Sequence, residues 1–527
     1  MSTSSALSNK QLWEQFAVLE SDLDYLVDFL VEEEVPYTLG VLASELTSHR
    51  YDQMTSMVED TLSQGRIYRP AESYVVGESI VFPNLNNLTG EIVDIRAGHN
   101  PEHDPFSIIR VKTDEGTERE FAAELTQPHP LNSVSYLPDD EMSADSVYET
   151  YGENIRAALQ SALEMSPQFV TVGEKWFERD LLADVSPGQV NIAEAVLDMV
   201  GGGPVATPEL LAEIGLPEEI SEPLRLFSLE YALLQDSRFD EVGPAGQVVW
   251  YLRDLEPAEV RETPPLLRRE PMPYNRQLLD DVMLSLEAQA ADEWSEPSVP
   301  AAVAVAQPSD EAVTVVLSYP HWRSGTLPLA SHVASFFPTA RIANRIRFTF
   351  VDDATGEEFP GWVVRRGRYV CGLRDWYAAK NTIVGSFVDL SRGDEAGQIR
   401  IGVRRIRSRR REWLRTVTVE GDNLLFEVTR VPVSCEFDDL AAVAVDNPDE
   451  IDALRQRFGR VPLESLLDRA FGGLAGLSLQ RAVHALTLYG VLNLFRRLPP
   501  GPMLAALAVS PKYISLGDNY WAYRGEE

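Results

Sequence analysis

Cysteine is nearly absent from this chain of 527 residues, which contains only Cys371 and Cys435. Two cysteines exclude a framework of several disulfides and a multi-cysteine zinc site, so we expect a reducing cytoplasm, with a single disulfide left open. No uninterrupted apolar run approaches the roughly 20 residues that cross a bilayer. The first residues, MSTSSALSNKQLWEQF, hold no basic segment followed by an apolar stretch. We therefore expect neither secretion nor membrane insertion.

Catalytic motifs are also missing. The sequence contains no P-loop, no GxSxG elbow and no Rossmann glycine pattern between a strand and a helix. His99 and His103, in HNPEH, leave a loop metal site open but have no obvious third ligand. Asp352 and Asp353 occur in a predicted hairpin turn with no lysine at nuclease spacing. We expect no enzyme, cofactor or metal, and a partner-dependent nuclease is the remaining enzymatic alternative.

Positive charge is scarce, because 46 Lys and Arg face 82 Asp and Glu and give a net charge of −36. Such a balance excludes nonspecific binding of nucleic acid by the whole surface, since phosphates must be met by Lys and Arg. However, residues 339–415 contain 17 basic and 9 acidic residues, a local charge of +8. One basic region with acidic neighbours is therefore predicted.

The N-terminal half alternates between helical and extended patterns. Apolar positions at helical spacing and the stop at Gly65 predict three helices and then extended chain, typical of a winged helix, over residues 1–76. Its third helix, DQMTSMVEDTLSQG, carries acids and no base, which favours protein contact over DNA. Short strands in residues 77–126 predict a small β-barrel of the SH3 or KOW type. Residues 148–256 predict a helical domain, with a helical apolar face at Trp176, Phe177, Leu181 and Leu182, that ends in a second winged helix.

The end of that domain, LLQDSRFDEVGPAGQVVWYLR, resembles the wing of the HARE-type winged helix, a family that includes the N-terminal domain of bacterial RNA polymerase delta subunit. The matching residues are Asp236, Arg238, Phe239, Gly243 and Trp250, within residues 207–253. The resemblance implies a domain used in transcription or DNA-linked complexes. The aromatic residues are expected in the core rather than on a contact surface.

The C-terminal half is predicted to begin after a Pro- and Ala-rich linker, residues 257–311, that holds one isolated helix in NRQLLDDVMLSLEAQ. Six or seven strands and two short helices predict a closed or nearly closed β pseudobarrel over residues 312–432. Residues 447–527 predict helices and a third winged-helix-like unit. The predicted fold class is thus α+β and multidomain, with winged helices, a small barrel and a larger pseudobarrel.

The strongest interaction signal is RRIRSRRREW, where six arginines occupy the eight positions from Arg404 to Arg411. Arginine makes bidentate contacts to phosphate, so nucleic acid is one predicted partner; the acidic neighbouring domains are the alternative. SGTLPLASHVASFFP, FPGWVVRRGRYV and GLRDWYAAKNTIVGSFVDL resemble the B-three DNA-binding pseudobarrel, which implies DNA contacts through its concave sheet. The candidate nucleic-acid-binding residues are Arg323, Arg365, Arg366, Arg374, Lys380, Arg404, Arg405, Arg407, Arg409, Arg410 and Arg411.

Together these patterns favour a bacterial-type, cytoplasmic adaptor associated with DNA or transcription. In this hypothesis the basic barrel contacts DNA or RNA, and the acidic winged helices contact RNA polymerase or another protein complex. The alternative is a protein interaction scaffold that binds no nucleic acid, with the arginines docked on the acidic domains. The sequence leaves the oligomeric state open.

Overall fold

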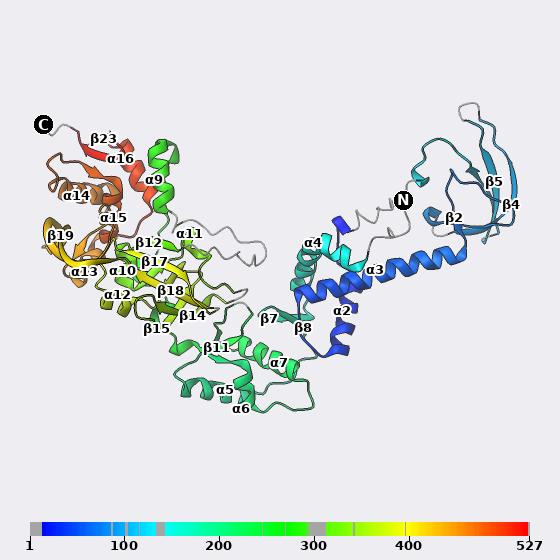
Figure 1. Ribbon diagram of the computed structural model, residues 1–527, viewed down its shortest axis with the longest axis horizontal. Coiled ribbons are helices and arrows are strands. Elements are labelled where there is room, and N and C mark those ends of the chain that lie inside the picture. The colour runs from blue at the N-terminus through cyan, green and yellow to red at the C-terminus, as the bar shows by residue number, and fades with distance from the viewer. Residues whose placement is uncertain are drawn as a thin grey trace. The chain divides into compact units, whose positions relative to one another are not determined.

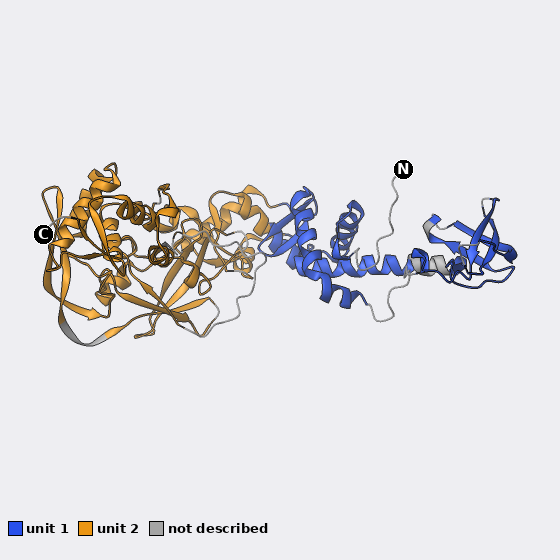
Figure 2. Ribbon diagram, turned by 90° about the horizontal axis from the view of Figure 1, so that it is seen from above, with its two compact units in different colours: residues 1–184, 217–228 blue, residues 185–216, 229–527 orange. Residues whose placement is uncertain are grey.

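The computed structural model describes residues 13–85, 88–100, 104–114, 116–132, 143–244, 246–268, 270–291, 294, 312–340, 343–395 and 397–524, without the side chains of 57–62, 84 and 406–410. The chain divides into two compact units (Figure 2). Unit 1 contains residues 1–184 and 217–228, and unit 2 contains residues 185–216 and 229–527. Helices and several separate sheets alternate along the chain (Figure 1), which confirms the predicted mixed class.

Unit 1 contains a group of helices with a small sheet, and a separate five-stranded sheet. The helices are α2 (Glu20–Glu33), α3 (Leu39–Gln64) and α4 (Ala144–Met165). The small sheet has the order β1-β8-β7 and consists of β1 (Tyr37–Thr38), β7 (Phe169–Val172) and β8 (Lys175–Glu178). The larger sheet has the order β2-β3-β4-β5-β6 and consists of β2 (Arg66–Ile67), β3 (Ser79–Phe82), β4 (Leu88–Ala97), β5 (Ser107–Thr113) and β6 (Glu118–Ala123).

The N-terminal helices are completed by residues far along the chain. β1 pairs with β8, so Tyr37 lies opposite Trp176, whereas the extended chain after Gly65 pairs with the five-stranded sheet. The helical face predicted at Trp176, Phe177, Leu181 and Leu182 is wrong. Trp176 and Phe177 belong to a β-hairpin whose turn includes Gly173 at φ 58°, and Leu181 and Leu182 lie in the turn that follows it. A turn with positive φ suits glycine and joins two strands rather than continuing a helix. The two helices predicted between Tyr37 and Gly65 are a single helix, α3.

The strands predicted in residues 77–126 are present as β3 to β6. They share one core, in which Ile80, Ile92, Ile109 and Val111 are fully buried. Buried and more exposed residues alternate over residues 90–93 in β4 and over residues 109–113 in β5, whereas Ile80, Val81 and Phe82 of β3 are all buried.

Unit 2 is larger. Its described residues form helices and four sheets. Its helices are α5 (Pro187–Met199), α6 (Thr207–Ile214), α8 (Ala258–Arg261), α9 (Asp281–Ala291), α10 (Tyr319–Ser324), α11 (Ser331–Ala334), α12 (Arg374–Lys380), α13 (Pro448–Phe458), α14 (Leu463–Ala475), α15 (Ala485–Phe495) and α16 (Pro500–Val509). The helix α7 (Glu222–Gln235) contains residues of both units.

A seven-stranded, nearly closed sheet forms the centre of unit 2, in the order β12-β17-β18-β14-β15-β16-β13. Its strands are β12 (Val313–Val316), β13 (Thr326–Pro328), β14 (Arg345–Asp352), β15 (Glu358–Val364), β16 (Tyr369–Cys371), β17 (Phe387–Arg392) and β18 (Gln398–Val403). Neighbouring strands are antiparallel except β14 and β18, which are parallel. The pseudobarrel predicted over residues 312–432 is therefore confirmed in its coarse form.

The last two strands predicted for that barrel do not belong to it. β19 (Arg405–Glu420) and β20 (Asn423–Cys435) pair with each other, and β21 (Ala444–Val445) adds to β19 as a third strand. Their length lets them form a hairpin with its own core, in which Leu414, Val433 and Cys435 are buried. Below, the two strands β19 and β20, residues 405–435, are called the ribbon.

The helix predicted within residues 257–311 is present as α9, but it is not isolated. Leu279, Met283 and Leu286 are buried in the same core as the C-terminal helices, and α9 packs against α16. Residues 292–293 and 295–311 lie outside the described residues. Among the described residues, no helix is long and apolar enough to cross a membrane.

One order of elements occurs three times: a helix, a two-residue strand, two further helices and a hairpin. The first copy consists of α2, β1, α3, α4, β7 and β8, and the five-stranded sheet is inserted between its second and third helices. The second copy uses β9 (Val205–Ala206), β10 (Phe239–Glu241) and β11 (Val249–Leu252), and the third uses β22 (Val483–His484), β23 (Tyr513–Gly517) and β24 (Tyr520–Tyr523). In every copy the two-residue strand pairs with the second hairpin strand, opposite Trp176, Trp250 or Trp521. These tryptophans are 1%, 0% and 4% exposed, so each sheet buries an indole.

Candidate nucleic-acid interface

The eleven basic residues predicted to bind nucleic acid lie in different parts of unit 2. Arg323 is in α10, Arg374 and Lys380 are in α12, and Arg365 with Arg366 follows β15. Arg404 precedes the ribbon, and the other five residues lie on its first strand, β19. The fold therefore separates the barrel arginines from the ribbon arginines.

Lys380 belongs to a buried cluster. Its ammonium lies 2.5 Å from Oδ2 of Asp352, a residue only 2% exposed. The same oxygen accepts a 2.5 Å hydrogen bond from Trp376, and Oδ1 accepts bonds of 2.9 Å from the backbone N–H groups of Ala354 and Thr355. Burial alone would raise the pKa of Asp352, but the bonds from Lys380 and Trp376 outweigh it and bring the pKa to about 2. Lys380 thus neutralises an internal carboxylate.

Other barrel cations are also engaged within the unit. Arg323 pairs with Asp449 and, at 2.7 Å, with Asp452, both in α13. Arg374 pairs with Glu259 at 3.1 Å. Arg404 donates to Asp389 at 3.0 Å and also to the Thr314 hydroxyl.

Arg365 and Arg366 hold the loop before β14. The Arg365 guanidinium donates to the carbonyl oxygens of Ala340 at 2.6 Å and Ala343 at 3.1 Å. The backbone N–H of Arg366 donates to Oδ1 of Asn344, and its side chain is exposed. Arg365 therefore has a structural task, while the Arg366 side chain faces solvent.

The ribbon presents its cations differently. Arg405 and Arg411 are exposed, and neither makes an ion pair with any side chain that the structure describes. The side chains of Arg407, Arg409 and Arg410 lie outside the described residues. Residues 405–415 and 428–435 of the ribbon together contain seven arginines and only one acid, Glu412. This part of the ribbon therefore carries a high density of positive charge.

Two ribbon residues were missing from the predicted set. Trp413 is 65% exposed, and the Arg430 guanidinium of the opposite strand lies 5.4 Å from the centroid of its ring. The register pairs Trp413 directly with Arg430. The sequence shows a Trp beside an arginine cluster, but the pairing that adds Arg430 depends on strand register, which the cluster itself does not encode.

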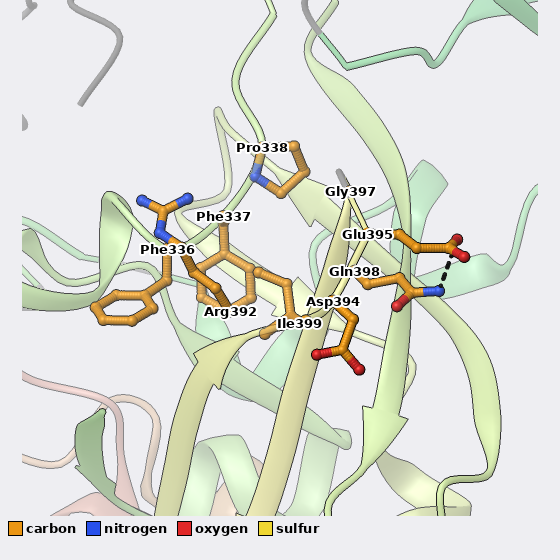
Figure 3. Close-up of a pocket in the computed structure, with 10 residues that line it drawn as sticks. Phe336, Phe337, Pro338, Arg392, Asp394, Glu395, Gly397, Gln398 and Ile399 are labelled. Carbon is orange, nitrogen blue, oxygen red and sulfur yellow. Dashed lines mark hydrogen bonds between the residues drawn. The ribbon is translucent and has the colours of Figure 1, made fainter. Parts of the chain in front are cut away.

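A shallow hollow of about 270 Å³ lies beside the turn between β17 and β18 (Figure 3). Arg392 stacks over Phe336, 5.8 Å from its ring centroid, and donates to the Ser335 carbonyl oxygen. Asp394 pairs with Arg400, and Glu395 accepts a hydrogen bond from Gln398. The charged groups that line the hollow thus already have partners. Because they include carboxylates as well as an arginine, the hollow does not suit a polyanion.

The structure places some of the residues that were considered for a nuclease or a metal site. Asp352 is held by Lys380, Trp376 and two backbone N–H groups, so it has no free coordination for a nuclease metal. No group of three His, Cys, Asp or Glu side chains able to hold a metal occurs in the described part of the chain. His103, of the possible HNPEH site, lies outside that part.

The residues that carry the HARE resemblance have structural roles in the second copy of the repeated order. Phe239 and Trp250 are 2% and 0% exposed, as expected for core residues, and Trp250 donates 3.1 Å to the Thr207 hydroxyl. Arg238 pairs with Asp236 at 2.7 Å and with Glu194. A Cβ at Gly243 would lie 2.1 Å from the Gln247 carbonyl oxygen, which explains the glycine in this hairpin.

Comparison with known proteins adds no assignment: no family model, no curated protein and no solved structure matches this chain.

Proposed function

We propose that this protein is a DNA- or transcription-associated adaptor that binds nucleic acid through the ribbon. The observation that carries the proposal is the contrast among its cations. Among the predicted barrel cations, Arg323, Arg374, Lys380 and Arg404 are paired with carboxylates of their own unit, Arg365 donates to carbonyl oxygens, and Arg366 faces solvent. On the ribbon, Arg405 and Arg411 are exposed within a dense arginine cluster and have no carboxylate partner among the described side chains. Phosphate contact requires accessible cations, so binding is assigned to the ribbon rather than to the concave face of a B-three-like barrel.

Winged helices are the proposed identity of the three repeated units, and the SH3 or KOW type is the proposed identity of the five-stranded sheet. The repeated order and the pairing of the short strand with the hairpin support the first assignment.

The third helices of the copies are poorly suited to DNA. In the first copy the third helix is α4, with four acids and one arginine. In the second copy it is α7, with two acids and one arginine, and in the third it is α16, which has no charged residue. A helix that enters a groove needs positive charge near phosphates, so these units are proposed to bind proteins.

The experiment compares full-length variants in binding to a labelled nucleic acid at low salt. Replacement of Arg405, Arg411 and Arg430 by Ala is expected to weaken binding strongly, while Arg374→Ala, a control already paired with Glu259, keeps the wild-type affinity. All variants should keep the far-UV spectrum, because the replaced side chains are exposed. Equal loss in both variants would refute the assignment to the ribbon.

A protein interaction scaffold without nucleic-acid binding is the second candidate. It is favoured by the same ion pairs, because they show that acidic partners within the unit take up many of the basic side chains. Absence of binding to single strands and duplexes at low salt by the intact wild-type chain would decide for the scaffold.

A further inference from the structure

The two faces of the ribbon differ in charge. Alternation along β19 and β20, with the observed register, places Arg411, Trp413, Arg415, Val428 and Arg430 on one face. The acids of these strands, Glu412, Glu420 and Glu427, belong to the opposite face. One face is therefore free of ribbon carboxylates, and an anionic ligand meets no ribbon acid there.

Only part of that face is open to a ligand. Toward the hairpin end, Val417 and Phe426 are buried in the core shared with the C-terminal helices. Arg415 is tied down by donating to the carbonyl oxygens of Leu440 at 3.0 Å and Ala442 at 3.2 Å. The open part contains Arg411, Trp413, Val428 and Arg430, which we call the ribbon patch.

Trp413 is the unusual member of the ribbon patch. Its side chain stays 65% exposed although Arg430 lies over the ring, and Val428 beside it is 43% exposed. Exposure of the apolar surface of an indole to water costs free energy, and a ligand that covers the ring recovers that free energy. The cation over the ring and a second arginine two residues away restrict the ligand to one with a flat π-surface and negative charge.

We propose that the ribbon patch binds single-stranded nucleic acid by stacking a base on Trp413, an inference that rests on the proposed nucleic-acid-binding function. An unpaired base offers its π-face, whereas duplex bases are stacked on each other and offer only their edges. Arg411 lies two residues, or about 7 Å, along the same face, and Arg430 lies opposite Trp413. Both guanidinium groups are placed to meet the phosphates that flank the stacked base.

Duplex DNA is the competing ligand, because a two-stranded ribbon fits a major groove. In that case Trp413 would serve as one contact among many and its π-surface would have no special role. The arginines would then determine the affinity, with the same weight for both kinds of nucleic acid. The two ligands can therefore be distinguished by changing the ring without changing the charge.

The test uses full-length Trp413→Leu and Trp413→Phe, with Leu425→Ala as a control for an exposed apolar residue, 41% exposed, on the other face. Each is titrated against a short labelled DNA strand of mixed sequence and against its duplex. Loss of one base stack is expected to weaken single-strand binding by Trp413→Leu roughly 5- to 150-fold. Trp413→Phe should retain most of the affinity, and Leu425→Ala should bind like the wild type.

Two further readouts make the result decisive. The salt dependence of single-strand binding should be the same in Trp413→Leu and wild type, because no phosphate contact is removed. Duplex affinity should change less than about two-fold. Equal weakening for the single strand and the duplex, or no weakening at all, overturns base stacking while leaving nucleic-acid binding intact. Failure of the wild type to bind either probe overturns the proposed function itself.

Discussion

Replacement of Lys380 by Met tests whether this lysine is a structural cation or a nucleic-acid contact. Methionine keeps the apolar stem but removes the ammonium that lies 2.5 Å from the Asp352 carboxylate. Loss of one partner from a buried pair costs about 3–5 kcal/mol. Because Trp376 and two backbone N–H groups still donate to Asp352, we expect the lower end, about 3 kcal/mol.

The assay is urea unfolding of the full chain at neutral pH, with the midpoint of the unit 2 transition as the reading. The difference in urea midpoint between wild type and Lys380→Met should become smaller as pH falls below about 4. A carboxylate whose pKa is lowered to about 2 stabilises the fold above its ordinary pKa of 3.8 and loses that effect as pH falls through 2. Without Lys380 the pKa of Asp352 is lowered less, so the variant loses less stability than the wild type on acidification.

Arg366→Met is the matched control, because its side chain is exposed and only its backbone N–H makes the bond to Asn344. It should unfold at the wild-type midpoint. The reasoning is refuted if Lys380→Met also has the wild-type midpoint but binds nucleic acid more weakly, since Lys380 would then be a ligand contact.

Three more predictions concern other parts of unit 2. Burial raises the pKa of Glu241 to about 7 from 4.5, so its contribution to stability is present below pH 4.5 and is lost as pH rises through 7. Glu241→Gln should remove this loss, which is at most about 1.4 kcal/mol per pH unit in that window. Thermal unfolding at pH 5 and at pH 8 measures the stability difference between wild type and variant, and a difference that is equal at both pH values would contradict the prediction. Thr207→Val leaves the buried Trp250 N–H without its acceptor and should destabilise by about 1–3 kcal/mol in urea titrations; an unchanged midpoint would contradict this. Phe471→Ala empties a fully buried site in the C-terminal core and should cost about 3–5 kcal/mol by the same assay, whereas a cost below about 1 kcal/mol would mean that the core is not packed as described.

Local patterns predicted much of the fold. The strands around Ile80 and Ile109, the barrel strands around Phe350 and Ile401, and the helix with Leu466 and Phe471 on one face all follow from apolar spacing, and the structure buries these residues. The buried Phe239 and Trp250 were likewise expected from the wing pattern.

The errors concern pairings between distant residues. The pairing of Tyr37 with Trp176 joins segments separated by the five-stranded sheet, so a local pattern around Trp176 indicated a helix instead. β19 and β20 look like further barrel strands, because their alternation does not reveal which neighbours they pair with.

The candidate site was predicted as a cluster but not as a surface. The arginine run identified the ribbon, yet the pairing of Arg323 with Asp452, 129 residues away, and of Lys380 with Asp352 depends on the complete fold. The same holds for Arg430, which reaches Trp413 only through the register of the two strands.

The central claim, that the ribbon is the phosphate-binding surface, is tested most directly by the salt dependence of binding to a short single strand. The wild-type affinity should fall steeply between about 50 and 200 mM salt. Replacement of Arg405, Arg411 and Arg430 by Ala should reduce the slope of log K against log salt by about 2, because each phosphate that an arginine neutralises on a single strand adds roughly 0.7 to that slope. An identical slope in the wild type and the triple variant, or wild-type binding that does not respond to salt, would contradict the account.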